Sequence, residues 1–282
     1  LTLSVNRLDL GEISSVVPYL PKVTGKLHGD YHILIDQQEH ISVVSDMAVY
    51  DMTYEGSPIG NISTELVYLM KEDDTHAVEA RLMLDDEEFG LLSGLYQAPT
   101  TGDDGKIDAT FTMTRMPLCL ANGFVPDQLV GLEGYGEGTL TIKGTTTHPD
   151  VNGEVYVDEA YLVSIPYGIR MRFDNDPVRI VGSHLLLENF GLYAYNDEPL
   201  NLMGNIDFSD TEHIAMDMRM QARNLLLINA RQEAKSIAYG KAFVNFYARM
   251  QGPSEELSMR GRLDVLGTTD LTYMLLDSPL ST

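Results

Sequence analysis

The feature that most constrains the fold is an alternation of apolar and polar residues with a period of two. Residues 213–222 read HIAMDMRMQA, which places Met216, Met218 and Met220 on one side of an extended chain and polar residues on the other. Side chains of a β-strand point alternately to its two faces, so the pattern predicts a strand with one dry face. Residues 76–84 repeat it. Shorter alternating pairs are Phe111 and Met113, Leu140 and Ile142, Val155 and Val157, and Leu263 and Val265.

Turn-forming residues separate these runs. The segments 72–75 (EDDT), 103–105 (DDG), 152–153 (NG) and 196–199 (NDEP) are interpreted as turns or breaks. Short strands and frequent turns along the whole chain predict an all-β protein. Helical periodicity is confined to residues 13–20 and 117–130, whereas residues 229–238 are open to a helix or an irregular excursion.

Charge and cysteine content exclude several classes of protein. Nineteen Lys and Arg stand against 42 Asp and Glu, giving a formal net charge of −23. This balance argues against nucleic acid and against an anionic membrane surface as partners. Cys119 is the only cysteine, so an intrachain disulfide and a cysteine-based zinc site are both excluded, and we expect it to be a small core residue.

The chain opens with Leu-Thr-Leu, without an initiator Met or a signal peptide, and it contains no apolar run long enough to span a membrane. We therefore expect a piece of a longer protein whose membrane anchor lies outside this chain.

Weak self-similarity suggests repeated units. Gly25-x-x-x-Gly29 recurs 109 positions later as Gly134-x-x-x-Gly138. The pair Gly144 and Gly153 recurs 108 positions later as Gly252 and Gly261. We expect one continuous β-region over residues 1–282, which can be divided into units of about 1–133 and 134–282.

The motifs of catalysis are missing. His28 and His32 share a strand face but have no further ligand at a suitable offset for a metal. The run Gly134–Gly138 precedes a strand and not a helix, so it is no nucleotide loop. Asp174–Asp176 lacks the remaining positions of a calcium loop, and Asp85–Glu88 is interpreted as a solvated turn. We expect no enzymatic activity, no metal and no cofactor.

Residues 134–160 carry a resemblance to a known family. They read GYGEGTLTIKGTTTHPDVNGEVYVDEA, in which a strand framed by glycines, a loop with Pro149 and a second strand after Gly153 follow one another. This order resembles the repeating units of the TamB family of AsmA-like proteins. Residues 239–273 and 8–30 are similar to other parts of that family.

The resemblance implies an elongated β-sheet that curls into a U-shaped apolar groove, in a protein of Gram-negative bacteria that is anchored in the inner membrane and spans the periplasm. It also implies phospholipid as a ligand, a TamA-type outer-membrane barrel protein as a partner, and a role in outer-membrane biogenesis.

Three functions remain open: a lipid-shielding groove, a scaffold or chaperone whose edge strands engage outer-membrane proteins by strand addition, and a secreted carbohydrate-binding domain. A structural interpretation also stands, because the methionines suit an ordinary sandwich core as well as a groove. The candidate groove residues are Val78, Leu82, Leu140, Ile142, Val155, Val157, Met216, Met218, Met220, Leu263 and Val265.

Overall fold

The computed structural model describes residues 1–12, 22–38, 40–54, 56–71, 73, 75–99, 104–124, 131–145, 147–164, 168–210, 213–232, 238–253 and 256–274. These residues form 17 strands of one antiparallel sheet and a short 3₁₀ helix. The strands are β1 (Thr2–Asp9), β2 (Val23–Ile35), β3 (Ile41–Tyr54), β4 (Ser57–Met70), β5 (Thr75–Leu84), β6 (Glu87–Gln97), β7 (Lys106–Pro117), β8 (Gly131–Thr145), β9 (Pro149–Ser164), β10 (Ile169–Phe173), β11 (Val178–Val181), β12 (His184–Tyr193), β13 (Pro199–Asp207), β14 (Ala215–Ala230), β15 (Ala238–Pro253), β16 (Ser258–Val265) and β17 (Asp270–Tyr273); the helix is η1 (Leu118–Phe124).

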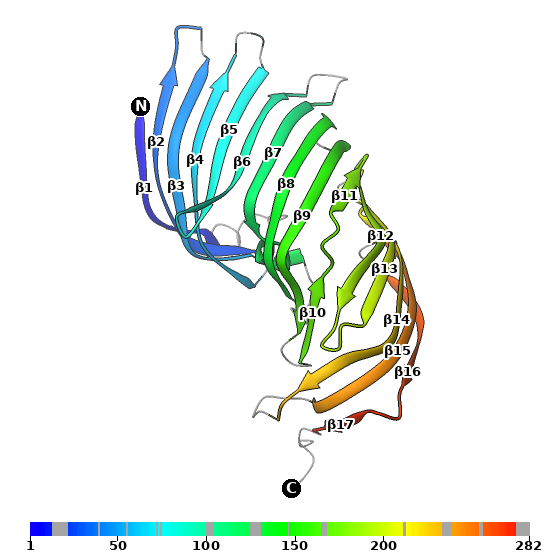
Figure 1. Ribbon diagram of the computed structural model, residues 1–282. Coiled ribbons are helices and arrows are strands. Elements are labelled where there is room, and N and C mark those ends of the chain that lie inside the picture. Colours follow the sequence, from blue (N-terminus) through cyan, green and yellow to red (C-terminus); the bar gives the residue numbers. More distant parts are fainter. Residues whose placement is uncertain are drawn as a thin grey trace.

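The strands pair in chain order, as Figure 1 shows from the blue to the red end. Each strand from β1 to β9 hydrogen-bonds to the next. The short strands β10 and β11 then share one place between β9 and β12. The series continues from β12 to β15, and both β16 and β17 pair with β15. The sheet is thus a meander of hairpins, and its outer strands are β1 at one end and β16 with β17 at the other.

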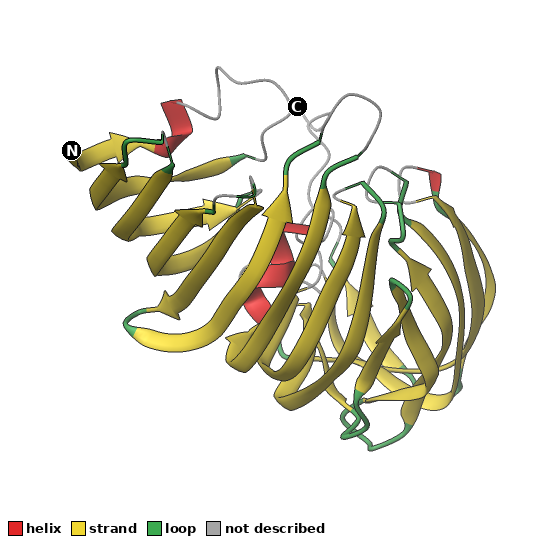
Figure 2. Ribbon diagram, turned by 90° about the horizontal axis from the view of Figure 1, so that it is seen from above, coloured by secondary structure: helices red, strands yellow, loops and turns green. Residues whose placement is uncertain are grey.

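Bulges bend the sheet, whose strands arch along their length in Figure 2. Asp51 and Asn224 have φ angles of 51° and 48° and lie where the pairing register shifts. In both cases the asparagine side chain of the next strand holds the bulge, since Asn61 and Asn245 accept the backbone N–H of Asp51 and Asn224. An extra residue in one strand increases the local twist, which contributes to the curvature.

Strands that are not neighbours in the sheet come together at one end of its C-terminal half. The N–H of Asn229, near the end of β14, donates to the carbonyl of Gly168, just before β10. Gly168 has a φ of +59°, and a Cβ there would lie 2.6 Å from the Cβ of Ala230. The sheet therefore curls towards the face on which β10 and β14 meet. That face carries the main core cluster, which includes Met171, Phe190, Leu192, Leu225 and Val244.

Several predictions from the sequence can be judged here. The all-β class and the strand at residues 76–84 are confirmed. The turn expected at 85–88 is limited to residues 85–86, because Glu87 and Glu88 belong to β6, and the break expected at 196–199 ends at residue 198, because Pro199 begins β13. The break at Asn152-Gly153 is wrong, because both residues lie inside β9. The helix at 117–130 is reduced to η1, with residues 125–130 outside the described part. Residues 229 and 230 belong to β14, and residues 233–237 and the expected helix at 13–20 lie outside the described residues.

The repeated glycines occupy comparable places. Gly25 in β2 and Gly134 in β8 both have positive φ, at +136° and +99°, and both lie at a register shift. The pairs 144/153 and 252/261 each span a hairpin, β8–β9 and β15–β16. The division between residues 133 and 134 falls inside β8, at a register shift, and β8 is paired with β9 on both sides of it.

Candidate functional site: one apolar face of the sheet

Register places the predicted residues on a common face. Residues directly opposite each other in neighbouring strands point to the same side of a sheet, as do residues two apart in one strand. Val78 lies opposite Tyr68 and Gly94, and Leu140 lies opposite Phe111 and Gly153. Followed from strand to strand, these pairs put all eleven predicted residues on one side, which we call the apolar face.

One lateral row shows how continuous the apolar face is. Starting at Leu3 in β1, direct pairing leads across the sheet to Gly252 in β15. Among the residues on this row the one small polar side chain is Ser45 in β3. The members of the row are Leu3, Tyr31, Ser45, Leu66, Ala80, Leu92, Phe111, Leu140, Gly153, Ile180, Leu185, Ile206, Met216 and Gly252.

The apolar face is packed differently in its two halves. In β10 to β15 it forms a core, in which Leu225 is 1% exposed and Val244 is 2% exposed. Most of its residues in β2 to β9 keep partial exposure, and Ile35 at the tip of β2 is mainly exposed. Two hydroxyl oxygens on this face, those of Ser45 and Thr64, are buried without a hydrogen-bond partner. Partial exposure of most side chains makes the face less covered in β2 to β9 than in β10 to β15, and the face is exposed again on β16, where Leu263 is 48% and Val265 62% exposed.

Helix η1 covers part of this face beside β8. The Leu118 side chain lies 3.5 Å from the point where a Cβ of Gly136 would stand. The side-chain amide of Asn122 bonds both backbone groups of Leu132, accepting from its N–H at 2.7 Å and donating to its carbonyl. Cys119, in the same helix, is partly buried, and desolvation raises the pKa of its thiol. It is therefore a weak nucleophile, in keeping with a packing role.

The opposite side, which we call the polar face, carries the ion pairs between strands. Arg81 bonds Glu65 at 2.9 Å and Glu88 at 3.1 Å. The Nε and Nη2 groups of Arg249 donate to the two carboxylate oxygens of Asp217 at 3.2 and 2.9 Å, and this contact lowers the pKa of Asp217. Exposed pairs of this kind contribute little stability each, but they show which side of the sheet the sequence has made compatible with water.

An apolar patch lies on the polar face, near the hairpin tips of β2 to β6. Its exposed members are Leu34, Val44, Val67, Leu69 and Leu95. Val44 and Val67 lie directly opposite each other, and Leu69 is in line with Leu95 through Ala77. Exposed apolar surface is thus not confined to the apolar face, so any binding experiment needs a control on this patch.

The residues singled out in the sequence as possible metal ligands can be located in the described part of the chain. This part contains no group of three metal-binding side chains. His28 packs edge-on against Tyr50, and His32 contacts the hydroxyl of Thr2. Residues 174–176 form the turn between β10 and β11. No helix in this part of the chain is long and apolar enough to cross a membrane.

Sequence reasoning missed the apolar residues of β12 and β13. The segment 199–207 does alternate, with Leu200, Leu202 and Ile206 on the apolar face, so the signal was present. In β12 the alternation is broken by Asn189, which has a φ of 61° and shifts the register before Phe190. A bulge moves the following side chains to the other face, which hides the period-two pattern.

Fold and site together define a class: a long, curved antiparallel meander with one apolar and one polar face. No protein-family model, no curated protein and no solved structure matches this chain.

Proposed function

We propose that the chain is a TamB-like segment that shields phospholipid acyl chains on its apolar face, in a curled sheet that acts as a U-shaped groove between the inner and outer membranes of a Gram-negative bacterium. The observation that carries the proposal is the lateral row from Leu3 to Gly252, which remains apolar in strand after strand. In an ordinary sandwich the inner faces are divided between two packed sheets. Here one sheet carries the row from its first strand to near its last.

The physical task is to lower the cost of exposing acyl chains to water. Burying a CH₂ group is worth ~0.8 kcal/mol, so a chain of about sixteen carbons faces a barrier on the order of 10 kcal/mol. A continuous apolar path removes much of that cost without chemistry. Neighbouring strands lie about 4.8 Å apart, so the row spans roughly 60 Å along the curve, which exceeds the ~30 Å thickness of a bilayer core.

In this proposal the eleven predicted residues and their in-register neighbours contact the acyl chains. The lipid moves along the apolar face towards a TamA-type barrel protein in the outer membrane. It requires no catalytic residue and no cofactor. The partial exposure of the face in β2 to β9 supports this half as the more accessible one.

Two adjacent valines allow a matched test. Val43 in β3 lies on the apolar face opposite Tyr68, and Val44 lies on the polar face, where it is 48% exposed. Substituting each in turn, Val43→Arg and Val44→Arg, makes the same chemical change on opposite faces of one strand. Met218 is a poorer choice because it is almost fully buried, so an arginine there would unfold the core.

The experiment is native mass spectrometry with lipid extraction on the chain expressed with periplasmic export. We expect phospholipid to co-purify with the unchanged chain and with Val44→Arg, and to be lost from Val43→Arg while its circular dichroism remains that of a folded sheet. Equal retention by both variants, or a lipid-free unchanged chain, would contradict the proposal.

The alternative is a scaffold for outer-membrane β-barrel assembly. It is favoured by the exposed apolar side chains on the outer strands, such as Leu3 in β1 and Met259 and Val265 in β16. Unpaired outer strands are ready sites for strand addition. Under this alternative, unfolded β-barrel peptides would bind to the chain and phospholipid would neither bind nor compete.

A further inference from the structure

The polar face of the C-terminal strands concentrates arginine in an otherwise acidic chain. Residues 219–264 contain eight Lys or Arg and four Asp or Glu, a net charge of +4, whereas the whole chain carries −23. Five of these cations are the arginines at 219, 223, 249, 260 and 262, which come from β14, β15 and β16. We call them the arginine cluster.

Three members of the arginine cluster form a row across three strands. Arg219 lies directly opposite Arg249, and Arg249 lies directly opposite Arg260. Strands lie about 4.8 Å apart, and like charges placed opposite each other destabilise a sheet. Of the three, only Arg249 forms an ion pair within the described residues, with Asp217, and the charge of Arg219 also contributes to lowering the pKa of that carboxylate. Repulsion between the three guanidinium groups therefore lowers the stability of the free chain, and a bound anion would reduce that repulsion.

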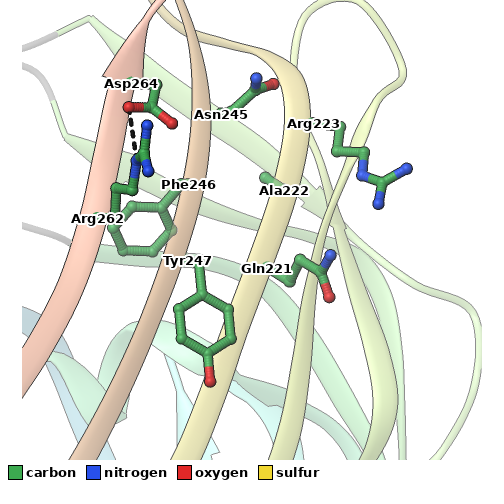
Figure 3. Close-up of a pocket in the computed structure, with 8 residues that line it drawn as sticks. All are labelled: Gln221, Ala222, Arg223, Asn245, Phe246, Tyr247, Arg262 and Asp264. Carbon is green, nitrogen blue, oxygen red and sulfur yellow. Dashed lines mark hydrogen bonds and ion pairs between the residues drawn. The ribbon is translucent and has the colours of Figure 1, made fainter.

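An open hollow of about 200 Å³ lies next to this row on the same face. Figure 3 shows its lining, with Arg262 and Asp264 on one side and Gln221 and Arg223 on the other. Gln221, Tyr247 and Arg262 form the row adjacent to the three arginines, since each lies two residues along its strand from one of them.

The hollow offers hydrogen bonds as well as charge. The Oδ1 of Asn245 accepts the backbone N–H of Asn224, which fixes its side-chain amide at the edge of the hollow. Asp264 accepts from the Nε of Arg262 at 2.8 Å and holds that guanidinium over the sheet. Tyr247, which lies directly opposite Gln221 and Arg262, is 52% exposed. Donors of this type recognise phosphate oxygens and hydroxyl groups.

We propose that the polar face of β14–β16 is a binding site for a phosphate-bearing ligand, with phosphate groups held by Arg219, Arg249 and Arg260 and the hydroxylated remainder in the adjacent hollow. The ligand's phosphate is carried either by a small soluble molecule or by a lipid headgroup. The site lies on the side of the sheet opposite the apolar face, and it does not depend on the proposed acyl-chain function.

Electrostatics favours a compact anion over an extended polyanion. The screening length at physiological ionic strength is about 8 Å, so a ligand confined to the arginine cluster feels mainly these cations. A nucleic acid would reach beyond the cluster and meet the acidic remainder of the chain. Guanidinium groups also bind phosphate through paired hydrogen bonds, which suits a small ligand with several phosphate oxygens.

The test is isothermal titration calorimetry of the full chain with pyrophosphate at low and at physiological ionic strength. The variant is the double substitution Arg219→Gln and Arg260→Gln, and its control is Lys143→Gln with Arg179→Gln, which removes the same charge elsewhere on the polar face. We expect salt-sensitive binding that weakens about tenfold or more in the first double variant and persists in the control. The first double variant should melt no lower than the unchanged chain, because it removes like-charge repulsion. If the first double variant melts at a lower temperature, the pyrophosphate titration is repeated with the single variant Arg260→Gln, which changes only the outer strand.

Vesicle flotation identifies the source of the phosphate. Stronger flotation with vesicles containing phosphatidylglycerol than with phosphatidylcholine alone, lost in Arg219→Gln with Arg260→Gln, would indicate a lipid headgroup. Pyrophosphate binding without that difference would indicate a soluble ligand. The proposal is overturned if pyrophosphate does not bind at low ionic strength, if both double variants lose binding equally, or if only an oligoglutamate peptide binds.

Discussion

Three glycine-to-alanine substitutions separate close packing from backbone preference. Gly153 in β9 has a φ of +155°, and a Cβ there would lie 2.2 Å from the carbonyl oxygen of Thr139 and 2.9 Å from a methyl group of Leu140. Gly182 has a φ of +55° with nothing within 4 Å of its Cβ position. Gly267 has neither a positive φ nor a near neighbour.

The expected costs follow from these geometries. At Gly153 the unfavourable backbone conformation costs about 1–3 kcal/mol, and moving β8 away from the new methyl weakens ladder hydrogen bonds worth ~1 kcal/mol each, so we expect a loss of about 3–4 kcal/mol. At Gly182 the left-handed conformation costs about 1–2 kcal/mol, partly offset by a less flexible unfolded chain. At Gly267 only that offset acts, so alanine stabilises by about 0.5 kcal/mol.

Urea titrations followed by far-ultraviolet circular dichroism measure the three differences, and thermal melting provides an independent ranking. We expect Gly153→Ala to be the least stable, Gly182→Ala intermediate and Gly267→Ala equal to or above the unchanged chain. If Gly153→Ala were as stable as Gly182→Ala, the close approach of β8 and β9 would not exist and the reasoning from Cβ positions would be refuted.

Three further predictions concern the core, one buried hydroxyl and one carboxylate. Leu225→Ala should cost about 3 kcal/mol in chemical denaturation, because the side chain is 1% exposed in the core, whereas Leu263→Ala, on the outer strand β16, should cost less than about 1 kcal/mol. Ser183→Ala should cost about 1–3 kcal/mol by the same measurement, because the buried hydroxyl bonds two backbone groups of β9, and equal stability would show that these bonds are dispensable. The hydrogen bond from Arg249 lowers the pKa of Asp217. The contribution of this contact to the free energy of unfolding is therefore fully present above the ordinary carboxyl pKa of 3.8, and it is lost as the pH falls towards the lowered pKa. Asp217→Asn should therefore flatten the fall in melting temperature below about pH 4 and leave a lower plateau at neutral pH, and an unchanged acid limb would contradict the assignment.

The alternating pattern was sufficient to predict strands and to select residues that share a face. The pattern carries information about a single strand, because the direction of each side chain there follows from its spacing along the chain. Met216, Met218 and Met220 could be assigned to one side for this reason. What spacing within a strand cannot supply is the pairing between strands. The path from Leu3 to Gly252 depends on the register of every hairpin, which is determined by turns and bulges along the way.

The failure at Asn152-Gly153 has a clear physical cause. An Asn-Gly pair is a strong hairpin signal because both residues tolerate positive φ. In this chain the glycine serves another need, since the backbone of β8 approaches so closely that no Cβ fits. Both uses require glycine, so the dipeptide alone does not distinguish a turn from a tightly packed strand.

The arginine cluster was hidden for a different reason. Arg219, Arg249 and Arg260 are separated by 30 and 11 residues, and each stands singly among apolar neighbours in its own strand. Nothing in the local sequence marks them as a group. The net charge even argued against nucleic acid and an anionic membrane surface as partners, because the sum over the whole chain averages an acidic N-terminal half with a basic C-terminal surface. A local site depends on charges within a screening length, and these become neighbours only when the strands pair.

Glycines on the apolar face link the curvature of the sheet to the continuity of that face. On the apolar face, Gly94 lies between Val78 and Ala109, and Gly138 lies between Met113 and Val155. A sheet that curls towards one face brings the side chains on that face together, so positions without a Cβ make room for bulky neighbours. Their placement on the apolar face supports the view that the glycines shape the sheet around that face, so that bending and an uninterrupted apolar path arise from one pattern.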